Sequence, residues 1–213
     1  EDQYALIHKL QPACLVGNNH HRVPYVGEDF QMFERDLPGE NTSGYSDGQE
    51  VSALPLETCE TMNRTWGYNI EDQHYKSAKT LIQLLVRAAG KNANLLMNIG
   101  PQPNGELPAV AVQRMKEMGE WLRQYGDSIY GTTAGDIPQQ EWGVTTRKGE
   151  RLFVHIFDLK SKELHLPLSC KVEKAYTFEG KQPVAFTATN GGVTLKFDTI
   201  PSGTDYIVEL ITK

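Results

Sequence analysis

Residues 94–105, NLLMNIGPQPNG, are the stretch that decides the fold. The apolar run 94–99 is typical of a strand buried on both faces, and the Gly- and Pro-rich residues after it predict a turn. Apolar residues recur at helical spacing on both sides, over 72–90 and again over 109–125. This order of helix, strand, loop and helix predicts parallel strands with crossover helices. On the second helix the inward face is expected to carry Val112, Met115, Gly119 and Leu122.

Upstream of this region, residues 1–11 fit a short helix that ends before Pro12. The run 14–17 is expected to be a short buried strand. An acidic, Gly-, Ser- and Asn-rich stretch then continues to about residue 55, and we expect it to be irregular. Such a long loop in a compact domain is usually functional.

The pattern changes near residue 132, beyond which only short alternating runs occur. These runs predict strands at 151–157, 163–166, 172–178, 193–197 and 206–211. The expected fold class is therefore α/β plus all-β, with an α/β part over residues 1–131 and an antiparallel β-sandwich over residues 132–213.

Composition excludes several classes of protein. The chain has 213 residues, 39% of them hydrophobic and 23% charged, as in a soluble globular protein. Its net charge of −6 argues against a nucleic-acid partner, and no apolar run is long enough for a membrane span. The sequence opens in what reads as the middle of a helix, so we expect further polypeptide before it. Three cysteines, Cys14, Cys59 and Cys170, match no metal spacing and are expected to be buried free thiols.

Titratable side chains are concentrated in residues 17–41, GNNHHRVPYVGEDFQMFERDLPGEN. In α/β proteins the reactive groups gather where parallel strands end. His20, His21 and Arg22 are candidates for hydrogen-bond donors to a hydroxylated ligand; the simpler alternative is one histidine packed on the strand and one in solvent. The two histidines lack the further ligands of a zinc site, so neither a metal nor a cofactor is expected.

Glu34 is the candidate proton donor of this stretch. It follows Phe30, Met32 and Phe33, and apolar surroundings disfavour the charged form of a carboxyl group and raise its pKa. The alternative is a surface acid paired with Arg35 or Arg22.

Two tryptophans are candidates for ligand contacts or packing. Trp66 lies in a predicted loop ahead of a helix, where an indole suits either the apolar face of a sugar or a hydrophobic anchor. Trp142 is expected to pack at the junction of the two parts. Residues 132–213 show no aromatic cluster that would mark a separate sugar site, so this part is expected to act as a buttress.

Four stretches in order resemble the α-L-fucosidases of glycoside hydrolase family 29. They are the Gly27–Glu34 loop with Asp36-Leu37-Pro38-Gly39-Glu40-Asn41, then Leu56-Glu57-Thr58-Cys59 to Trp66-Gly67-Tyr68, then residues 94–101, and finally Gly119-Glu120-Trp121-Leu122 with residues 126–130. The resemblance covers about residues 13–131, and the following strands match less specifically.

This resemblance implies a retaining exo-enzyme that removes terminal α-L-fucose from a fucosylated oligosaccharide through two carboxyl groups. It implies the acid/base role for Glu34, with Asp29, Glu40 and Glu57 as alternatives. Arg22 resembles the family's sugar-contacting arginine, although Asn-Asn-His-His-Arg here replaces the usual Asn-Asp-Arg, so His20 and His21 are candidates for the same contacts. Trp66 resembles an aromatic near the sugar pocket.

The family's nucleophilic aspartate and its earlier barrel strands have no counterpart in these 213 residues. The sequence therefore resembles the last part of a TIM-like (β/α) barrel followed by its sandwich, and the expected partner is an N-terminal segment of the same enzyme carrying the nucleophile. Residues 1–131 are expected to be unstable without it. The competing hypothesis is a non-catalytic carbohydrate-binding protein on the same scaffold.

Overall fold

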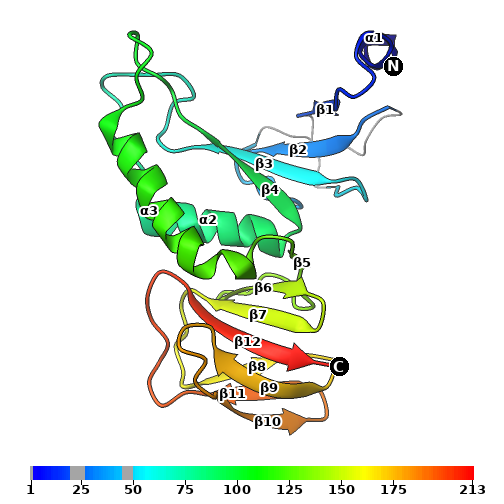
Figure 1. Ribbon diagram of the computed structural model, residues 1–213, viewed down its shortest axis with the longest axis vertical. Coiled ribbons are helices and arrows are strands. Elements are labelled where there is room, and N and C mark those ends of the chain that lie inside the picture. The colour runs from blue at the N-terminus through cyan, green and yellow to red at the C-terminus, as the bar shows by residue number, and fades with distance from the viewer. Residues whose placement is uncertain (1, 20–26, 45–49) are drawn as a thin grey trace. The chain divides into compact units, whose positions relative to one another are not determined.

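The structure is a computed structural model that describes residues 2–19, 27–44 and 50–213 (Figure 1). The chain divides into two compact units, each of which is built from two stretches of sequence. The first comprises Glu1–Lys76 and Asn92–Ala111, and the second comprises Ser77–Lys91 and Val112–Lys213. These units differ from the domains expected on either side of residue 131, and that boundary stays a prediction.

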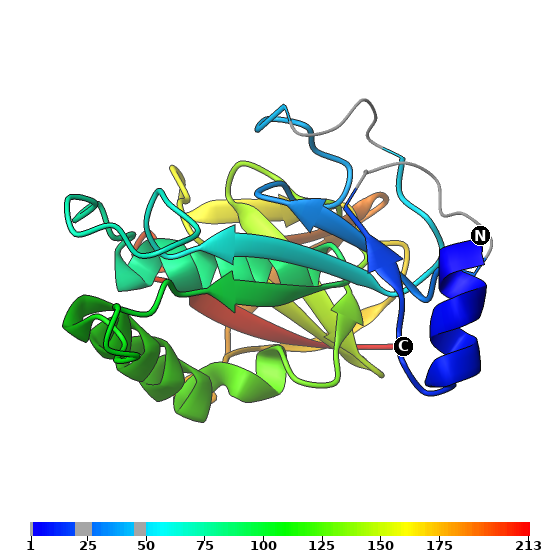
Figure 2. The same cartoon turned by 90° about the horizontal axis from the view of Figure 1, so that it is seen from above.

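A parallel sheet forms the centre of the first unit. In hydrogen-bonded order its described strands are β1 (Gly17–Asn18), β2 (Phe30–Glu34), β3 (Leu56–Thr61) and β4 (Ala93–Asn98), and each neighbouring pair is parallel. Figure 2 shows the arrowheads of β2, β3 and β4 pointing the same way. The parallel arrangement and the strand at β4 confirm the predictions made from residues 94–105.

One of these strands corrects the sequence-based expectation, because β2 lies in the stretch up to about residue 55 that was expected to be irregular. Strand β3, which begins directly after that stretch, was not predicted. Within β2, Gln31 and Phe33 are buried while the residues on either side are partly exposed. This alternation is that of a half-buried strand. It was not recognised in the sequence because many acidic residues and glycines surround it. The strand expected at 14–17 is also wrong in extent, because β1 begins only at Gly17.

The N-terminal helix is α1 (Asp2–Leu10), which confirms a helix over residues 1–11. None of its described residues is buried, and Leu10 is 75% exposed. The helix is attached to the sheet by polar contacts instead. Tyr4 donates a hydrogen bond to Glu28, and His8 contacts Asp29.

Two longer helices follow the predicted spacing with different details. Helix α2 (Ala78–Gly90) begins after Ser77, whose side chain accepts a hydrogen bond from the Thr80 amide, so the helix expected from Asp72 starts six residues later. Helix α3 (Ala109–Tyr125) has the predicted bounds but a different inward face. Met115 is 46% exposed, whereas Met118 and Trp121 are buried.

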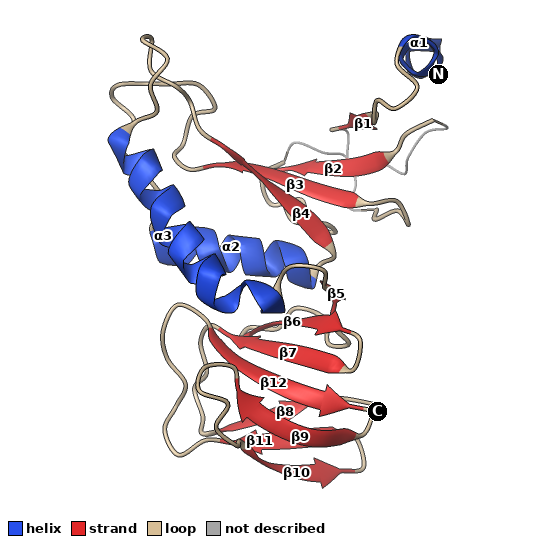
Figure 3. Ribbon diagram, viewed as in Figure 1, coloured by secondary structure: helices blue, strands red, loops and turns tan. Residues whose placement is uncertain are grey.

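After the short 3₁₀ helix η1 (Gly126–Ser128), the described chain forms strands joined by turns and loops, without a further helix (Figure 3). One antiparallel sheet has the order β5-β6-β7-β12-β9 and the other has the order β10-β11-β8. The strands are β5 (Thr133–Ala134), β6 (Gly143–Lys148), β7 (Arg151–Ile156), β8 (Glu163–Leu166), β9 (Val172–Thr177), β10 (Ala185–Thr189), β11 (Gly192–Lys196) and β12 (Tyr206–Thr212). The five strands predicted here are confirmed, while β5, β6 and β10 were not predicted.

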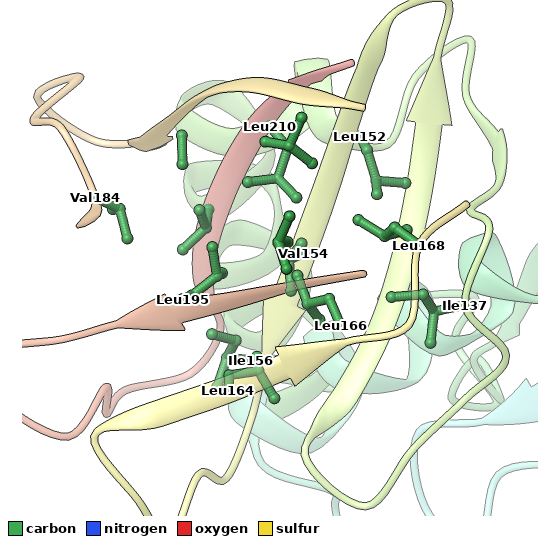
Figure 4. Close-up of a cluster of buried hydrophobic side chains, with 14 residues drawn as sticks. Ile137, Leu152, Val154, Ile156, Leu164, Leu166, Leu168, Val184, Leu195 and Leu210 are labelled. Carbon is green, nitrogen blue, oxygen red and sulfur yellow. The ribbon is translucent and has the colours of Figure 1, made fainter. Parts of the chain in front are cut away.

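Both antiparallel sheets contribute to one hydrophobic core (Figure 4). Leu152 and Leu210 come from the larger sheet, Leu166 and Leu195 come from the smaller one, and all four are fully buried. Trp142 packs against this core. The core explains why the strands of this unit alternate in sequence, since each sheet turns one face inward.

The cysteines, all within the described residues, are free thiols, as expected. Each is partly exposed, so the expectation that they are buried is wrong.

Candidate active site at the carboxyl edge of the parallel sheet

The carboxyl ends of β2, β3 and β4 bring three polar side chains to one edge of the sheet. Glu34 ends β2 and pairs in register with Cys59 on β3. Thr61 ends β3 and pairs with Asn98, the last residue of β4. Because side chains alternate between faces along a strand, Glu34, Cys59, Thr61 and Asn98 lie on the same face.

Glu34 is held at the strand end by its neighbours. Its carboxylate accepts a hydrogen bond from the side-chain amide of Asn19, which follows β1. The buried Thr58 hydroxyl lies within hydrogen-bond distance of the Phe33 and Asp36 carbonyls and donates to this turn. Asn19 thus holds the Glu34 carboxylate, and Thr58 on β3 fixes the backbone on either side of this residue.

The chain leaves β2 through a left-handed residue, because Arg35 has a φ of 57°. A non-glycine residue in this conformation costs about 1–2 kcal/mol. The Arg35 side chain compensates with contacts: its guanidinium donates to the Arg64 carbonyl at 2.6 Å and lies 4.8 Å from the centroid of the Trp66 ring. Arg35 therefore joins the end of β2 to the loop after β3.

Trp66 is partly exposed in this loop, and its backbone is fixed from two sides. Its carbonyl accepts a hydrogen bond from the Asn98 side chain at 2.8 Å. Asp72 accepts from the Arg64 and Thr65 amides, each at 2.9 Å. Burial disfavours the charged form of Asp72, but hydrogen bonds from the Thr65, Arg64 and His74 amides outweigh it and lower the pKa of this carboxyl group.

The pKa of the Cys59 thiol depends on the charge of the neighbouring Glu34. Burial raises the pKa of this thiol, and the negative charge of Glu34 raises it further. The side chain opposite Glu34 is thus a neutral thiol at neutral pH. Leu96 on β4 pairs with Cys59 and therefore lies on the same face as Glu34. Its side chain is 50% exposed, so the structure leaves this face of β4 uncovered at Leu96.

The other acids considered from the sequence lie elsewhere. Asp29 precedes β2, at the opposite edge of the sheet, where it accepts from the Val16 amide at 2.7 Å and contacts His8. Glu57 is the second residue of β3 and pairs with Met32. Glu40 lies in the turn region after β2, its amide bonded to the Leu37 carbonyl.

The predicted ligand contacts His20, His21 and Arg22 lie outside the described residues. Of the predicted site residues, the structure thus brings Glu34 and Trp66 into one neighbourhood through Arg35. Sequence reasoning missed Asn19, Thr58 and Cys59. Thr58 and Cys59 lie in one of the stretches that resemble the family, and Asn19 precedes the two histidines, but neither position indicated a contact with Glu34.

Within the described ranges, no cluster of three or more His, Cys, Asp or Glu residues could hold a metal ion. The described helices also include none that is long and apolar enough to cross a membrane.

Polar groups gathered at the carboxyl ends of parallel strands are the arrangement of α/β enzymes. A family model described as Alpha-L-fucosidase matches residues 1–127. The chain therefore belongs to the α-L-fucosidase family, glycoside hydrolase family 29.

Two curated relatives illustrate the likeness. The plasma alpha-L-fucosidase of Rattus norvegicus is 38% identical over 108 residues, which are 47% of this chain and 24% of that protein. The alpha-L-fucosidase of Branchiostoma floridae is 28% identical over 156 residues, which are 68% of this chain and 35% of the relative. The chain thus matches about a third or less of the length of these relatives.

Solved structures extend the likeness to the whole chain. Alpha-L-fucosidase isoenzyme 1 from Paenibacillus thiaminolyticus matches with a TM-score of 0.81 and 30% identity, over 100% of this chain and 53% of that chain. The alpha-fucosidase of Thermotoga maritima matches with a TM-score of 0.74 and 25% identity, over 99% of this chain and 48% of the other.

Proposed function

We propose that this chain supplies the acid/base half of a retaining exo-α-L-fucosidase that acts on terminal α-L-fucose of oligosaccharides. Residues 1–131 are then the last part of a TIM-like (β/α) barrel, and residues 132–213 are its C-terminal β-sandwich. The proposal is supported by family membership and by the parallel sheet, whose Glu34-bearing face includes the half-exposed Leu96. Parallel sheets are normally covered on both faces, so this face suits closure by further strands.

The single observation that carries the mechanism is the position of Glu34 at the carboxyl end of β2. Of the four acids considered, it alone ends a described strand at that edge. Asp29 lies at the amino end of β2, with its carboxylate engaged by the Val16 amide. Glu57 lies near the amino end of β3.

In the proposed reaction the protonated Glu34 donates its proton to the glycosidic oxygen as the bond to the leaving group breaks. A carboxylate from polypeptide outside these 213 residues attacks the anomeric carbon and forms a covalent fucosyl ester. Glu34, now a carboxylate, takes a proton from water, which attacks the anomeric carbon and releases fucose. Retention requires the two carboxyl groups to lie about 5 Å apart.

The remaining site residues orient the sugar in this proposal. Trp66 offers a partly exposed indole, and the Arg35 guanidinium beside its ring restricts its orientation. His20, His21 and Arg22 donate hydrogen bonds to the fucose hydroxyls.

The test compares two substrates of the complete enzyme. We expect Glu34→Gln to slow hydrolysis of 2′-fucosyllactose by roughly 10²–10⁴-fold, because its leaving group needs protonation. Hydrolysis of 4-nitrophenyl fucoside should suffer much less, since nitrophenolate leaves without a proton. Glu57→Gln is the matched control and should leave the ratio of the two rates unchanged. Equal losses on both substrates in Glu34→Gln would exclude Glu34 as the proton donor.

A second experiment tests whether this chain needs the preceding half of the barrel for activity. Residues 1–213 alone should not cleave 4-nitrophenyl fucoside, and joining them to the preceding half of the Paenibacillus enzyme should restore cleavage. Hydrolysis by the isolated 213 residues would overturn the division of the active site.

A further inference from the structure

Aromatic side chains that are distant in sequence meet in the second unit. The rings of Tyr125 and Phe178 lie 5.8 Å apart between centroids, and those of Phe197 and Tyr206 lie 6.0 Å apart. Trp121 continues the first group, 5.4 Å from Tyr125. No such cluster was visible over residues 132–213 of the sequence, because Tyr125 on α3, Phe178 after β9 and Tyr206 on β12 are far apart in the chain and meet only in the folded unit.

Two adjoining hollows lie along these rings, with volumes of about 320 and 290 Å³. They share Thr177, Gln182 and Tyr206, and we refer to the pair as the Tyr206 groove. The first hollow adds Tyr125, Phe178, Glu179 and Asp205, and the second adds Lys196, Phe197 and Asp198. Together they reach the size typical of small-ligand sites.

Polar groups in the groove lack partners among the residues that the structure describes. Asp205 is buried, and its Oδ2 lies 2.7 Å from His155 Nδ1, but its Oδ1 has no hydrogen bond. Tyr206 is half-buried; burial raises the pKa of its phenol, and no described group bonds to its hydroxyl. A buried polar atom without a partner is costly, so such atoms point to a ligand or to ordered water.

Gln182 also has a polar atom that can bind a ligand. Its side-chain nitrogen donates to the Gly180 carbonyl at 2.9 Å, which leaves the amide oxygen for a ligand. Glu179 accepts a hydrogen bond from the Tyr125 hydroxyl at 3.1 Å.

The charges around the groove are of both signs. Asp205 is paired with the buried His155, and the negative Glu179 and Asp198 lie in the same groove as the positive Lys196. The ammonium of Lys181 lies 4.4 Å from the centroid of the Phe178 ring. The acids that line the groove outnumber Lys196, so the groove does not favour an anion. Aromatic walls with hydrogen-bonding groups beside them suit the apolar face and the hydroxyls of a sugar.

We propose that the Tyr206 groove binds a neutral oligosaccharide, with one sugar ring in each hollow and Tyr206 between them. Tyr206 contributes its ring and its hydroxyl, while the exposed Gln182 accepts a hydrogen bond from a sugar hydroxyl through its amide oxygen. The site lies entirely within the second unit and does not depend on the proposed hydrolysis.

The experiment titrates the ¹⁵N-labelled full chain with lactose and with cellobiose, which contain no fucose. Binding should shift the amide signals of residues 177–182 and of Tyr206, with a Kd on the order of 1 mM. Because neither disaccharide offers a fucose to the carboxyl edge of the parallel sheet, the result is independent of the acid/base role of Glu34.

Variants separate recognition from folding. Tyr206→Ala should weaken binding about tenfold or more, and Tyr206→Phe, which keeps the ring, should weaken it only about two- to threefold. Gln182→Ala, at an exposed position, should weaken it about threefold without disturbing the core. Tyr130→Ala is the matched control, because Tyr130 is 61% exposed and lies outside the groove.

Two results would overturn the proposal. One is that neither disaccharide shifts these amide signals at concentrations up to roughly 50 mM. A titration to that concentration would detect binding far weaker than the expected Kd on the order of 1 mM. The other is a shift of the same amides by the diamine putrescine with no response to either disaccharide, which would make the groove a cation site.

Discussion

At the scale of single residues, Glu34 and Cys59 lie opposite each other on β2 and β3. A negative charge at Glu34 raises the pKa of the Cys59 thiol, in addition to the effect of burial. The thiol therefore acts as a built-in reporter of the charge on Glu34, independent of any activity.

Removing that charge should make Cys59 more reactive. In a chain with Cys14 and Cys170 replaced by serine, Glu34→Gln should lower the Cys59 pKa and raise its alkylation rate by iodoacetamide at pH 8 about two- to threefold. The rate is measured by mass spectrometry of the labelled peptide. Glu57→Gln should give a smaller increase, since the effect of Glu57 on Cys59 is weaker. An unchanged or lower rate in Glu34→Gln would show that the two side chains are not neighbours.

A second residue-scale feature is the carboxylate of Glu209, which is 7% exposed on β12. Burial raises its pKa, but hydrogen bonds from Arg151, at 2.5 Å, and from Lys181 outweigh this and lower the pKa overall. A carboxyl group with a lowered pKa in the folded state stabilises the fold above its unfolded pKa of about 4.3. That contribution disappears as the pH falls through the folded pKa.

Glu209→Gln should therefore destabilise the second unit at pH 7 by about 1–3 kcal/mol. The loss should shrink as the pH falls from about 4.3 through the lowered folded pKa, because the wild-type carboxyl group is protonated first in the unfolded chain and then in the folded one. Urea unfolding at several pH values measures both effects. Glu173→Gln, which removes a carboxylate paired with Lys213 nearer the surface, should change stability much less than Glu209→Gln. A pH-independent loss in Glu209→Gln would assign the effect to packing instead of charge.

At the scale of elements, the two long helices contain glycines in opposite environments. A Cβ added at Gly90, the last residue of α2, would lie 2.7 Å from the Val144 Cβ on β6. A Cβ added at Gly119 in α3 would meet nothing within 4 Å. The first glycine is thus required by close helix–sheet packing, and the second is not.

Alanine substitutions should reveal this difference. Gly90→Ala should destabilise the second unit by about 1–3 kcal/mol, because β-branched Val144 has little freedom to move aside. Gly119→Ala should stabilise it by about 0.5–1 kcal/mol, since alanine loses less backbone entropy in a helix. Thermal unfolding followed by circular dichroism compares the two. Equal effects of the same sign would contradict the close approach of α2 to β6.

At the scale of the whole molecule, the two units differ in how their cores are closed. The second unit encloses fully buried leucines between two sheets. The parallel sheet of the first unit leaves Leu96 half-exposed on the face that carries Glu34. Stability is lowest where few apolar contacts protect the backbone hydrogen bonds.

Hydrogen exchange of the isolated 213 residues should therefore show slow exchange in β7 and β12 and faster exchange in β2 and β4. Adding the preceding half of a related enzyme should slow exchange in β2 and β4 but leave β7 unchanged. Gel filtration of the isolated chain should show association through the open sheet. A compact monomer with equal protection in both units would contradict the expected dependence on further strands.

Much of this molecule was determined by local sequence. The apolar run at β4, the period of α3 and the alternation of β7 and β12 each lie within a short segment, and such patterns predict elements without knowledge of the rest of the chain. Glu34 became a candidate through its apolar neighbours and its motif, and its catalytic role stays a prediction. The strands β2 and β3 were missed because acidic and polar residues interrupt their short patterns.

Only the tertiary structure decided which of these groups meet. It brought Cys59 opposite Glu34, stacked Arg35 on Trp66, and gathered Tyr125, Phe178 and Tyr206 into one groove. Periodicity in sequence reports which face of an element avoids water, and this is a short-range property. Contacts between residues tens of positions apart depend on strand order and register, which no local pattern encodes.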